Sequence, residues 1–143
     1  MRAITLLFFL FLFQIPEGHA QVEETIEPEY IRTIQFKGTS AQSRLPIIEL
    51  GQKLQLSFDD IIGNEADYFY TIAHFNFDWT PSDLSKGEYL DGFDDVRIET
   101  YENSFNTLQL YSNYKLSIPN RETRAIKKSG NYLLRIFNDD GEI

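Results

Sequence analysis

A group of acidic residues is the densest set of potential cation ligands in this sequence. Asp91, Asp94 and Asp95 lie close together, and Glu88 precedes them by a few positions. Calcium takes six to eight oxygen ligands arranged around a tight loop. The spacing lacks the alternating D-x-D-x-D order of known calcium loops, so the pattern favours a solvated acidic loop over a metal site. Whether Asp91, Asp94 and Asp95 contact a cation stays open at this point.

Residues able to carry catalysis are few. Glycoside hydrolysis needs two carboxylates facing each other across a cleft, and no spacing in the chain marks such a pair. His74 lies in an apolar run, without a Gly-x-Ser-x-Gly elbow for acyl transfer, and is best interpreted as a core or edge histidine bonded to a neighbour. The chain has no cysteine, which excludes thiolate chemistry and disulfides. The sequence therefore predicts no catalytic residue, no metal ligand set and no cofactor, and we expect a protein that is not an enzyme.

One long segment between predicted strands, residues 78–95, could instead mediate binding. It carries Trp79, Tyr89, Leu90 and Phe93, which are possible protein-interface residues because exposed aromatic side chains often anchor interfaces. Trp79 could alternatively stack on a sugar ring, as in carbohydrate-binding modules, or cap the core. If these side chains pack inward, the segment is structural and the interface lies elsewhere.

The N-terminus indicates export. Residues 3–13 form a nearly unbroken apolar run after Arg2, and Gly18-His19-Ala20 offers small residues for signal-peptidase cleavage. The run is too short to cross a bilayer, which takes about 20 apolar residues. We therefore expect a signal peptide at residues 1–20, an acidic leader at 21–29, and no transmembrane segment after cleavage.

The remaining chain, residues 30–143, has the length of one domain. The net charge of the whole chain, −9, argues against nucleic acid and anionic membranes as partners. The hairpin-turn sequence Asn138-Asp139-Asp140-Gly141 is followed by only two residues, and we interpret the domain as the N-terminal part of a longer protein.

Apolar residues alternate with polar ones along much of this domain, which is typical of half-buried strands. The pattern is clear at residues 53–59, 96–99 and 114–118, and shorter at 33–37, where Ile34 and Phe36 would face the core. Residues 68–77 and 132–137 are apolar on both faces and are predicted to be central strands, while Pro46 suggests an edge strand or bulge at 44–50. About seven such strands predict an all-β fold, an immunoglobulin-like antiparallel β-sandwich.

A series of short motifs, in a fixed order, resembles the N-terminal domain of the type IX secretion system plug protein family, formerly a domain of unknown function. The motifs are Tyr70, His74, Phe77-Asp78-Trp79-Thr80-Pro81-Ser82, Glu88-Tyr89-Leu90-Asp91-Gly92-Phe93, Ile98, Tyr101, Ser104-Phe105-Asn106-Thr107, Tyr111, Tyr114, Ile118-Pro119-Asn120 and Ser129-Gly130-Asn131-Tyr132-Leu133-Leu134.

The resemblance implies a periplasmic β-rich protein, peripheral to the outer membrane, that binds the large outer-membrane translocon barrel of the type IX secretion system and closes its periplasmic opening. It implies no catalytic residues. Two alternatives remain: a carbohydrate-binding module of an exported glycan-processing system, which exposed coplanar aromatics on one sheet would favour, and the accessory sandwich of an enzyme.

Overall fold

The fold consists of short and medium-length strands with one helical turn. The computed structural model describes residues 28–38 and 45–139, so the expected signal peptide and most of the acidic leader lie outside the described residues. The strands are β1 (Ile31–Lys37), β2 (Leu54–Asp60), β3 (Tyr68–Phe75), β4 (Leu90–Gly92), β5 (Val96–Arg97), β6 (Tyr101–Asn103), β7 (Ser112–Ile118), β8 (Thr123–Ile126) and β9 (Asn131–Asn138), and helix α2 (Lys86–Tyr89) lies between β3 and β4.

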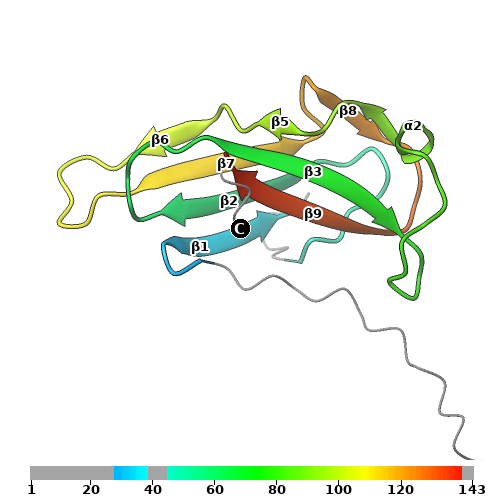
Figure 1. The fold of residues 1–143 in the computed structure, drawn as a ribbon, viewed down its shortest axis with the longest axis horizontal. Coiled ribbons are helices and arrows are strands. Elements are labelled where there is room, and N and C mark those ends of the chain that lie inside the picture. The colour runs from blue at the N-terminus through cyan, green and yellow to red at the C-terminus, as the bar shows by residue number, and fades with distance from the viewer. Residues whose placement is uncertain (1–27, 39–44, 140–143) are drawn as a thin grey trace, which may run out of the picture.

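Two antiparallel sheets form the body of the domain. One has the strand order β1-β2-β7-β6 and the other β5-β3-β9, while β4 and β8 pair separately. Figure 1 shows β3 and β9 crossing over the layer that contains β1, β2 and β7, with α2, β4 and β8 gathered at one end. The predicted all-β, antiparallel sandwich is confirmed. The described residues contain nine strands instead of about seven, because strands of two to four residues leave little periodicity in a sequence.

The core is built from aromatic side chains of both sheets. Tyr68 of β3 packs edge-on against Phe58 of β2 and Tyr114 of β7, with ring centroids 5.2 and 4.7 Å apart. Phe58 and Tyr114 stack on each other at 5.3 Å. All three side chains are at most 2 % exposed. The alternation predicted along β2 and β7 is therefore confirmed, and it brings the two sheets together face to face.

A buried carboxylate closes one end of this core. Asp60, the last residue of β2, is fully buried and accepts hydrogen bonds from the Tyr68 hydroxyl (2.9 Å) and from the Ile62 backbone N–H (2.8 Å). Buried carboxylates are tolerated when donors satisfy their oxygens. Asp60 thereby fixes both the start of β3 and the turn that follows β2.

We expect Tyr68→Phe to lower the free energy of unfolding by about 2 kcal/mol, because it leaves one oxygen of a buried carboxylate without its donor. Urea unfolding followed by circular dichroism measures this. Tyr101→Phe is the matched control, since the Tyr101 hydroxyl also donates to a carboxylate, that of Glu65, but at an exposed position. Equal losses in the two variants would contradict the structural role of Asp60.

Stability is also expected to fall in alkali. Burial, with the nearby Asp60 charge, raises the pKa of Tyr114 from 10.0 to about 12. Between these pH values the unfolded chain has released the Tyr114 proton and the folded chain still holds it, so the stabilisation present below pH 10 is lost as pH rises. The expected slope from this tyrosine is about 1.4 kcal/mol per pH unit. Urea titrations at pH 9 to 12 should show a shallower decline for Tyr114→Phe than for the native protein; identical slopes would contradict the assignment.

The first strand departs from the prediction. Thr33 has a φ of 56°, and the pairing of β1 with β2 shifts register between Arg32 and Gln35. Plain alternation would put Ile31 and Phe36, five positions apart, on opposite faces, and the bulge lets both face the core. Ile34, expected in the core, lies within the bulge and is 44 % exposed.

Three further expectations are corrected. Residues 45–50 form no strand, and the turn at Gly51 therefore joins no hairpin. Residues 78–95, expected as a loop, contain α2 and β4, whose three or four residues are too short to show a period. In its sheet, β3 is central as predicted, but β9 is the outermost strand among the described residues.

Candidate functional site

The four predicted interface residues separate into two pairs. Trp79 is 42 % exposed and Phe93 is 72 % exposed. Tyr89 and Leu90 are instead only 6 % and 2 % exposed, and the Tyr89 hydroxyl donates to the Ile72 carbonyl at 3.1 Å. Tyr89 and Leu90 thus face the core and hold α2 and β4 against β3. For these two residues the structure has the inward packing that the sequence left open as the alternative.

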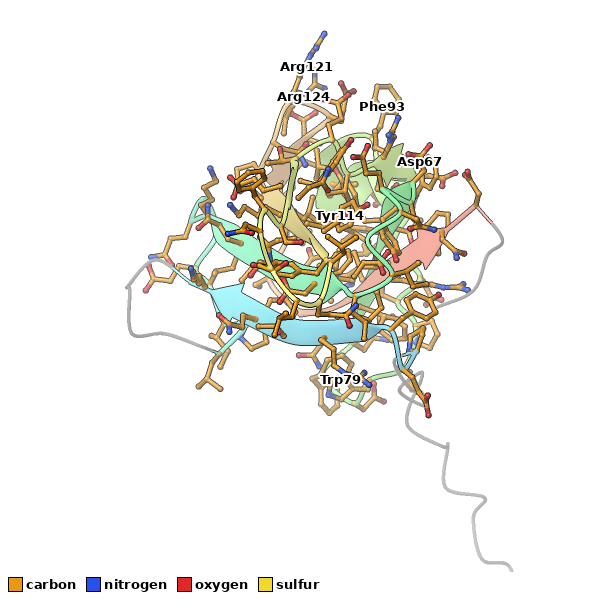
Figure 2. All side chains as sticks on the ribbon, turned by 90° about the vertical axis from the view of Figure 1, so that its left-hand side faces the viewer. Asp67, Trp79, Phe93, Tyr114, Arg121 and Arg124 are labelled. Atoms are coloured by element: carbon orange, nitrogen blue, oxygen red, sulfur yellow. The ribbon has the colours of Figure 1, made fainter. Side chains whose placement is uncertain are left out.

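Trp79 and Phe93 do not form one surface. Figure 2 places them on opposite sides of the domain. Trp79 has a φ of 63° in a turn closed by the hydrogen bond from Asn76 N–H to the Thr80 carbonyl (2.8 Å). Asp78 Oδ1 accepts hydrogen bonds from the Thr80 N–H and hydroxyl, so these two residues organise this turn. Each aromatic residue can therefore contact a partner only separately.

Two residues of the acidic cluster, Asp91 and Asp94, form ion pairs within the protein. Asp94 forms an ion pair with Lys86 at 2.7 Å, accepts the Ile72 N–H at 2.7 Å, and has a side chain only 4 % exposed. Asp91 pairs with Arg124 at 2.8 Å. Asp94 is thus a structural residue that ties α2 to β3, and not part of a solvated loop. In the described ranges, no group of three or more histidine and carboxylate side chains is placed to hold a metal ion.

His74 contacts aromatic rings and a backbone carbonyl. Its ring stacks on Tyr89 at 5.6 Å and meets Tyr132 edge-on at 5.0 Å, and its Nε2 lies 3.2 Å from the Ser129 carbonyl oxygen. The predicted role as a histidine bonded to a neighbour is confirmed. Gly130 lies directly against this ring, where a Cβ would approach Nε2 to 2.3 Å.

An exposed apolar surface lies in the connection between β6 and β7, residues 104–111, which we call the β6–β7 loop. Phe105 is 93 %, Leu108 111 % and Leu110 59 % exposed, and the neighbouring Ile62 is 53 % exposed. Sequence reasoning missed this surface. The available signal was a run of apolar residues, Phe105, Leu108 and Leu110, separated only by Asn, Thr and Gln.

Hydrogen bonds hold this loop in one shape. The Ser104 N–H donates to the Tyr111 carbonyl at 2.8 Å, and the Tyr111 N–H donates to the Ser104 hydroxyl at 2.9 Å, which closes its base. Gln109 Nε2 donates to the Ile61 carbonyl at 2.8 Å, which binds the loop to the turn after β2. The exposed side chains of the β6–β7 loop are thus presented on a fixed backbone, which lowers the entropic cost of binding.

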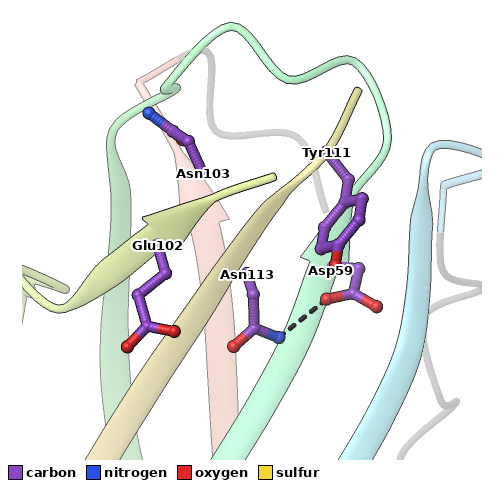
Figure 3. A pocket seen from close by; sticks show the side chains of 5 residues that line it. All are labelled: Asp59, Glu102, Asn103, Tyr111 and Asn113. Carbon is purple, nitrogen blue, oxygen red and sulfur yellow. Dashed lines mark hydrogen bonds between the residues drawn. The ribbon is translucent and has the colours of Figure 1, made fainter. Parts of the chain in front are cut away.

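A polar cleft lies on the outer face of the four-stranded sheet, beside the β6–β7 loop (Figure 3). It has a volume of about 340 Å³, and its lining residues are Asp59, Glu102, Asn103, Tyr111 and Asn113. Asn113 Nδ2 donates to Asp59 Oδ1 at 2.7 Å, and Glu102 pairs with Lys115 at 2.9 Å. The cleft's polar groups thus largely satisfy one another, and a single tyrosine is its only ring.

No helix in the described residues is long and apolar enough to span a bilayer.

Comparison with known proteins identifies the domain. A family model described as the type 9 secretion system plug protein first domain matches residues 31–143. A search of the curated proteins found no match.

Among solved structures, the chain is similar to the crystal structure of a hypothetical protein from Parabacteroides merdae, with a TM-score of 0.76 and 34 % sequence identity. The similarity covers 85 % of this chain and 31 % of that protein, so this chain spans about a third of that protein's length. The family resemblance found in the sequence motifs is confirmed by the family model, and the chain belongs to the type 9 secretion system plug protein family, whose first domain it matches.

Proposed function

We propose that this protein is a periplasmic, non-enzymatic plug of the type IX secretion system, which binds the outer-membrane translocon barrel and closes its periplasmic side. The single observation that carries the proposal is the match of residues 31–143 to the first domain of the plug family. The export signal expected at residues 1–20 agrees with a periplasmic location.

The physical properties of the domain suit reversible closure. The net charge of the chain, −9, favours solubility and keeps the protein away from anionic lipid surfaces. A sandwich core of interlocking aromatic rings gives a rigid body, and loops on such a body are the usual contact elements. A plug needs both rigidity and a limited apolar contact that can be released.

We place the main contact on the β6–β7 loop. Four exposed apolar side chains, Ile62, Phe105, Leu108 and Leu110, lie at one end of the sandwich on a backbone fixed by hydrogen bonds. Exposed apolar clusters on a soluble domain commonly mark protein-binding sites. Trp79 and Phe93 remain two separate candidate contacts, because both are exposed but they lie on opposite sides of the domain.

A carbohydrate-binding role has less support. Sugar-binding sandwiches present coplanar aromatic faces on one sheet. Among the described residues, the four exposed aromatic side chains, Phe77, Trp79, Phe93 and Phe105, all lie outside the strands. The stacked pair on the outer face of β3 and β9, Phe69 and Phe137, is half-buried, with the rings covering each other at a centroid distance of 5.7 Å.

The test is an affinity pull-down of the mature, full-length protein from detergent-solubilised outer membranes, followed by mass spectrometry. Recovery of the translocon barrel, well above its level on beads carrying an unrelated acidic periplasmic protein, supports the plug function. Recovery of glycans or glycan-uptake proteins without the barrel would replace the plug proposal with the carbohydrate-binding one.

A further inference from the structure

Most exposed sheet edges of the described domain carry features that discourage pairing with another strand. The edge strands β4, β5, β6 and β8 have only two to four residues. The longer edge strand β1 contains the bulge between Arg32 and Gln35, and both Arg32 and Lys37 are charged. Short length, bulges and basic residues are the usual means by which proteins protect edges.

Strand β9 has almost none of this protection. It is eight residues long and pairs with β3 in unbroken register from Asn131 to Asn138. Five of its residues are apolar or aromatic, and Arg135 is its one charge. Among the described residues no strand pairs with its other side. An edge of this length and composition is a template for a further strand.

The backbone groups that would receive this strand can be identified. The Tyr68 and Tyr70 carbonyls accept hydrogen bonds from Ile98 and Asp95, each at 2.7 Å, so these residues of β3 point their backbone groups toward β5. The backbone groups of the residues between them, Phe69 and Thr71, therefore point toward β9.

The direction of the β9 backbone follows from the register. Phe69 and Thr71 are paired with Phe137 and Arg135, whose backbone groups therefore point to β3. The alternate residues of β9, which are Tyr132, Leu134 and Ile136, point their N–H and C=O groups away from β3, to the unpaired edge.

The sheet order identifies what is missing. In an immunoglobulin-type sandwich one sheet has the order A-B-E-D and the other C-F-G. The order β1-β2-β7-β6 corresponds to A-B-E-D, and the neighbours β3 and β9 correspond to C and F. The position of strand G, beside β9, has no strand among the described residues.

We propose that a strand of the same polypeptide, following β9, pairs antiparallel with β9 through Tyr132, Leu134 and Ile136 and completes the strand order C-F-G in this sheet. The family model describes a first domain, and the similar protein from Parabacteroides merdae is about three times as long as the matched region, so such proteins contain further polypeptide. β9 ends at Asn138, and the sequence Asn138-Asp139-Asp140-Gly141 is of a kind common in hairpin turns. A strand joined by a short turn has a high effective concentration at the edge. This inference does not depend on barrel binding.

The experiment is residue-resolved amide hydrogen exchange by NMR on the complete, mature protein without partners. The amides of Arg135 and Phe137, bonded to β3, serve as the internal reference within the same strand. If the extra strand is present, the amides of Tyr132, Leu134 and Ile136 exchange within about 10-fold of the reference rates. An open edge predicts exchange roughly 100-fold or more faster at these three positions, which would overturn the proposal.

Two further outcomes identify another occupant and also overturn it. Protection that appears only when the purified translocon barrel is added would mean that the partner donates the strand. Protection that rises with protein concentration would mean that a second copy does. Because the readout is the protection of three amides, it can fail while the pull-down succeeds, and the reverse.

Discussion

Replacing Gly92 with alanine is expected to destabilise the domain by about 3 to 5 kcal/mol, which is among the larger effects of a single substitution. Gly92 ends β4 with a φ of +102°, a conformation that residues with a side chain rarely adopt. An added Cβ would lie 2.0 Å from the Glu122 carbonyl oxygen and 3.0 Å from the Arg124 nitrogen. Both are backbone atoms, so the strand pair itself must move apart.

The consequences of that movement reach the core. The Phe93 N–H donates to the Glu122 carbonyl at 2.9 Å, and the Thr123 hydroxyl donates to the Phe93 carbonyl at 2.6 Å. The Thr123 hydroxyl also lies 2.8 Å from the Tyr70 hydroxyl, and Tyr70 is 1 % exposed. Separating β4 from β8 therefore disrupts a buried hydrogen-bond network, which adds to the steric and backbone strain.

Gly51→Ala is the matched control for this prediction. Gly51 also has a positive φ, +85°, but nothing lies within 4 Å of the position of its Cβ. We expect only the backbone strain there, about 1 kcal/mol. Urea unfolding of the two variants separates backbone strain from steric clash. If Gly92→Ala lowers the free energy of unfolding no more than Gly51→Ala does, the β4–β8 pair accommodates the added Cβ without a steric cost.

The sequence predicted the parts of the fold that follow from alternation over five or more residues. Strands β2, β3, β7 and β9 were recognised because burial on one face, or on both, leaves a periodic record. The inward turn of Tyr89 and Leu90 could not be predicted, because it depends on α2 and β4 folding back on β3 through contacts between distant residues. The edge position of β9 could not be predicted for a related reason. The residue pattern of an apolar strand is the same whether it pairs with a neighbouring strand on both sides or on one side.

The candidate site was the least predictable part. The sequence indicated the aromatic residues of segment 78–95 by their residue type alone. Whether a side chain in this fold is exposed depends instead on the geometry of its loop. Phe105 and Leu108 are exposed on a loop whose shape is held partly by the hydrogen bond from Gln109 Nε2 to the Ile61 carbonyl. Such an arrangement depends on a turn more than forty residues away in sequence, so no local pattern records it.

The double substitution Phe105→Asp and Leu108→Asp is expected to weaken binding to the translocon barrel by roughly 100-fold, about 2.7 kcal/mol in binding free energy. It replaces the two most exposed apolar side chains of the β6–β7 loop with carboxylates, which would have to be desolvated in an apolar interface. Both side chains project into solvent in the isolated domain, so the free energy of unfolding should change by less than about 0.5 kcal/mol. Binding is measured by titrating purified, detergent-solubilised barrel against labelled full-length protein.

Ile47→Asp is the control for charge and exposure. Ile47 is 74 % exposed, and it precedes β2 whereas the β6–β7 loop contacts the turn after β2, so the two sites belong to opposite ends of that strand. Each added carboxylate makes the acidic protein more negative wherever it is placed. A general electrostatic effect would therefore weaken binding of both the loop variant and Ile47→Asp. Loss of a local contact would weaken binding of the loop variant alone. If the double variant binds the barrel as tightly as the native protein, the β6–β7 loop is not the contact. The same titration of Trp79→Ala and Phe93→Ala would then test the two exposed residues of segment 78–95 that the sequence singled out as interface candidates.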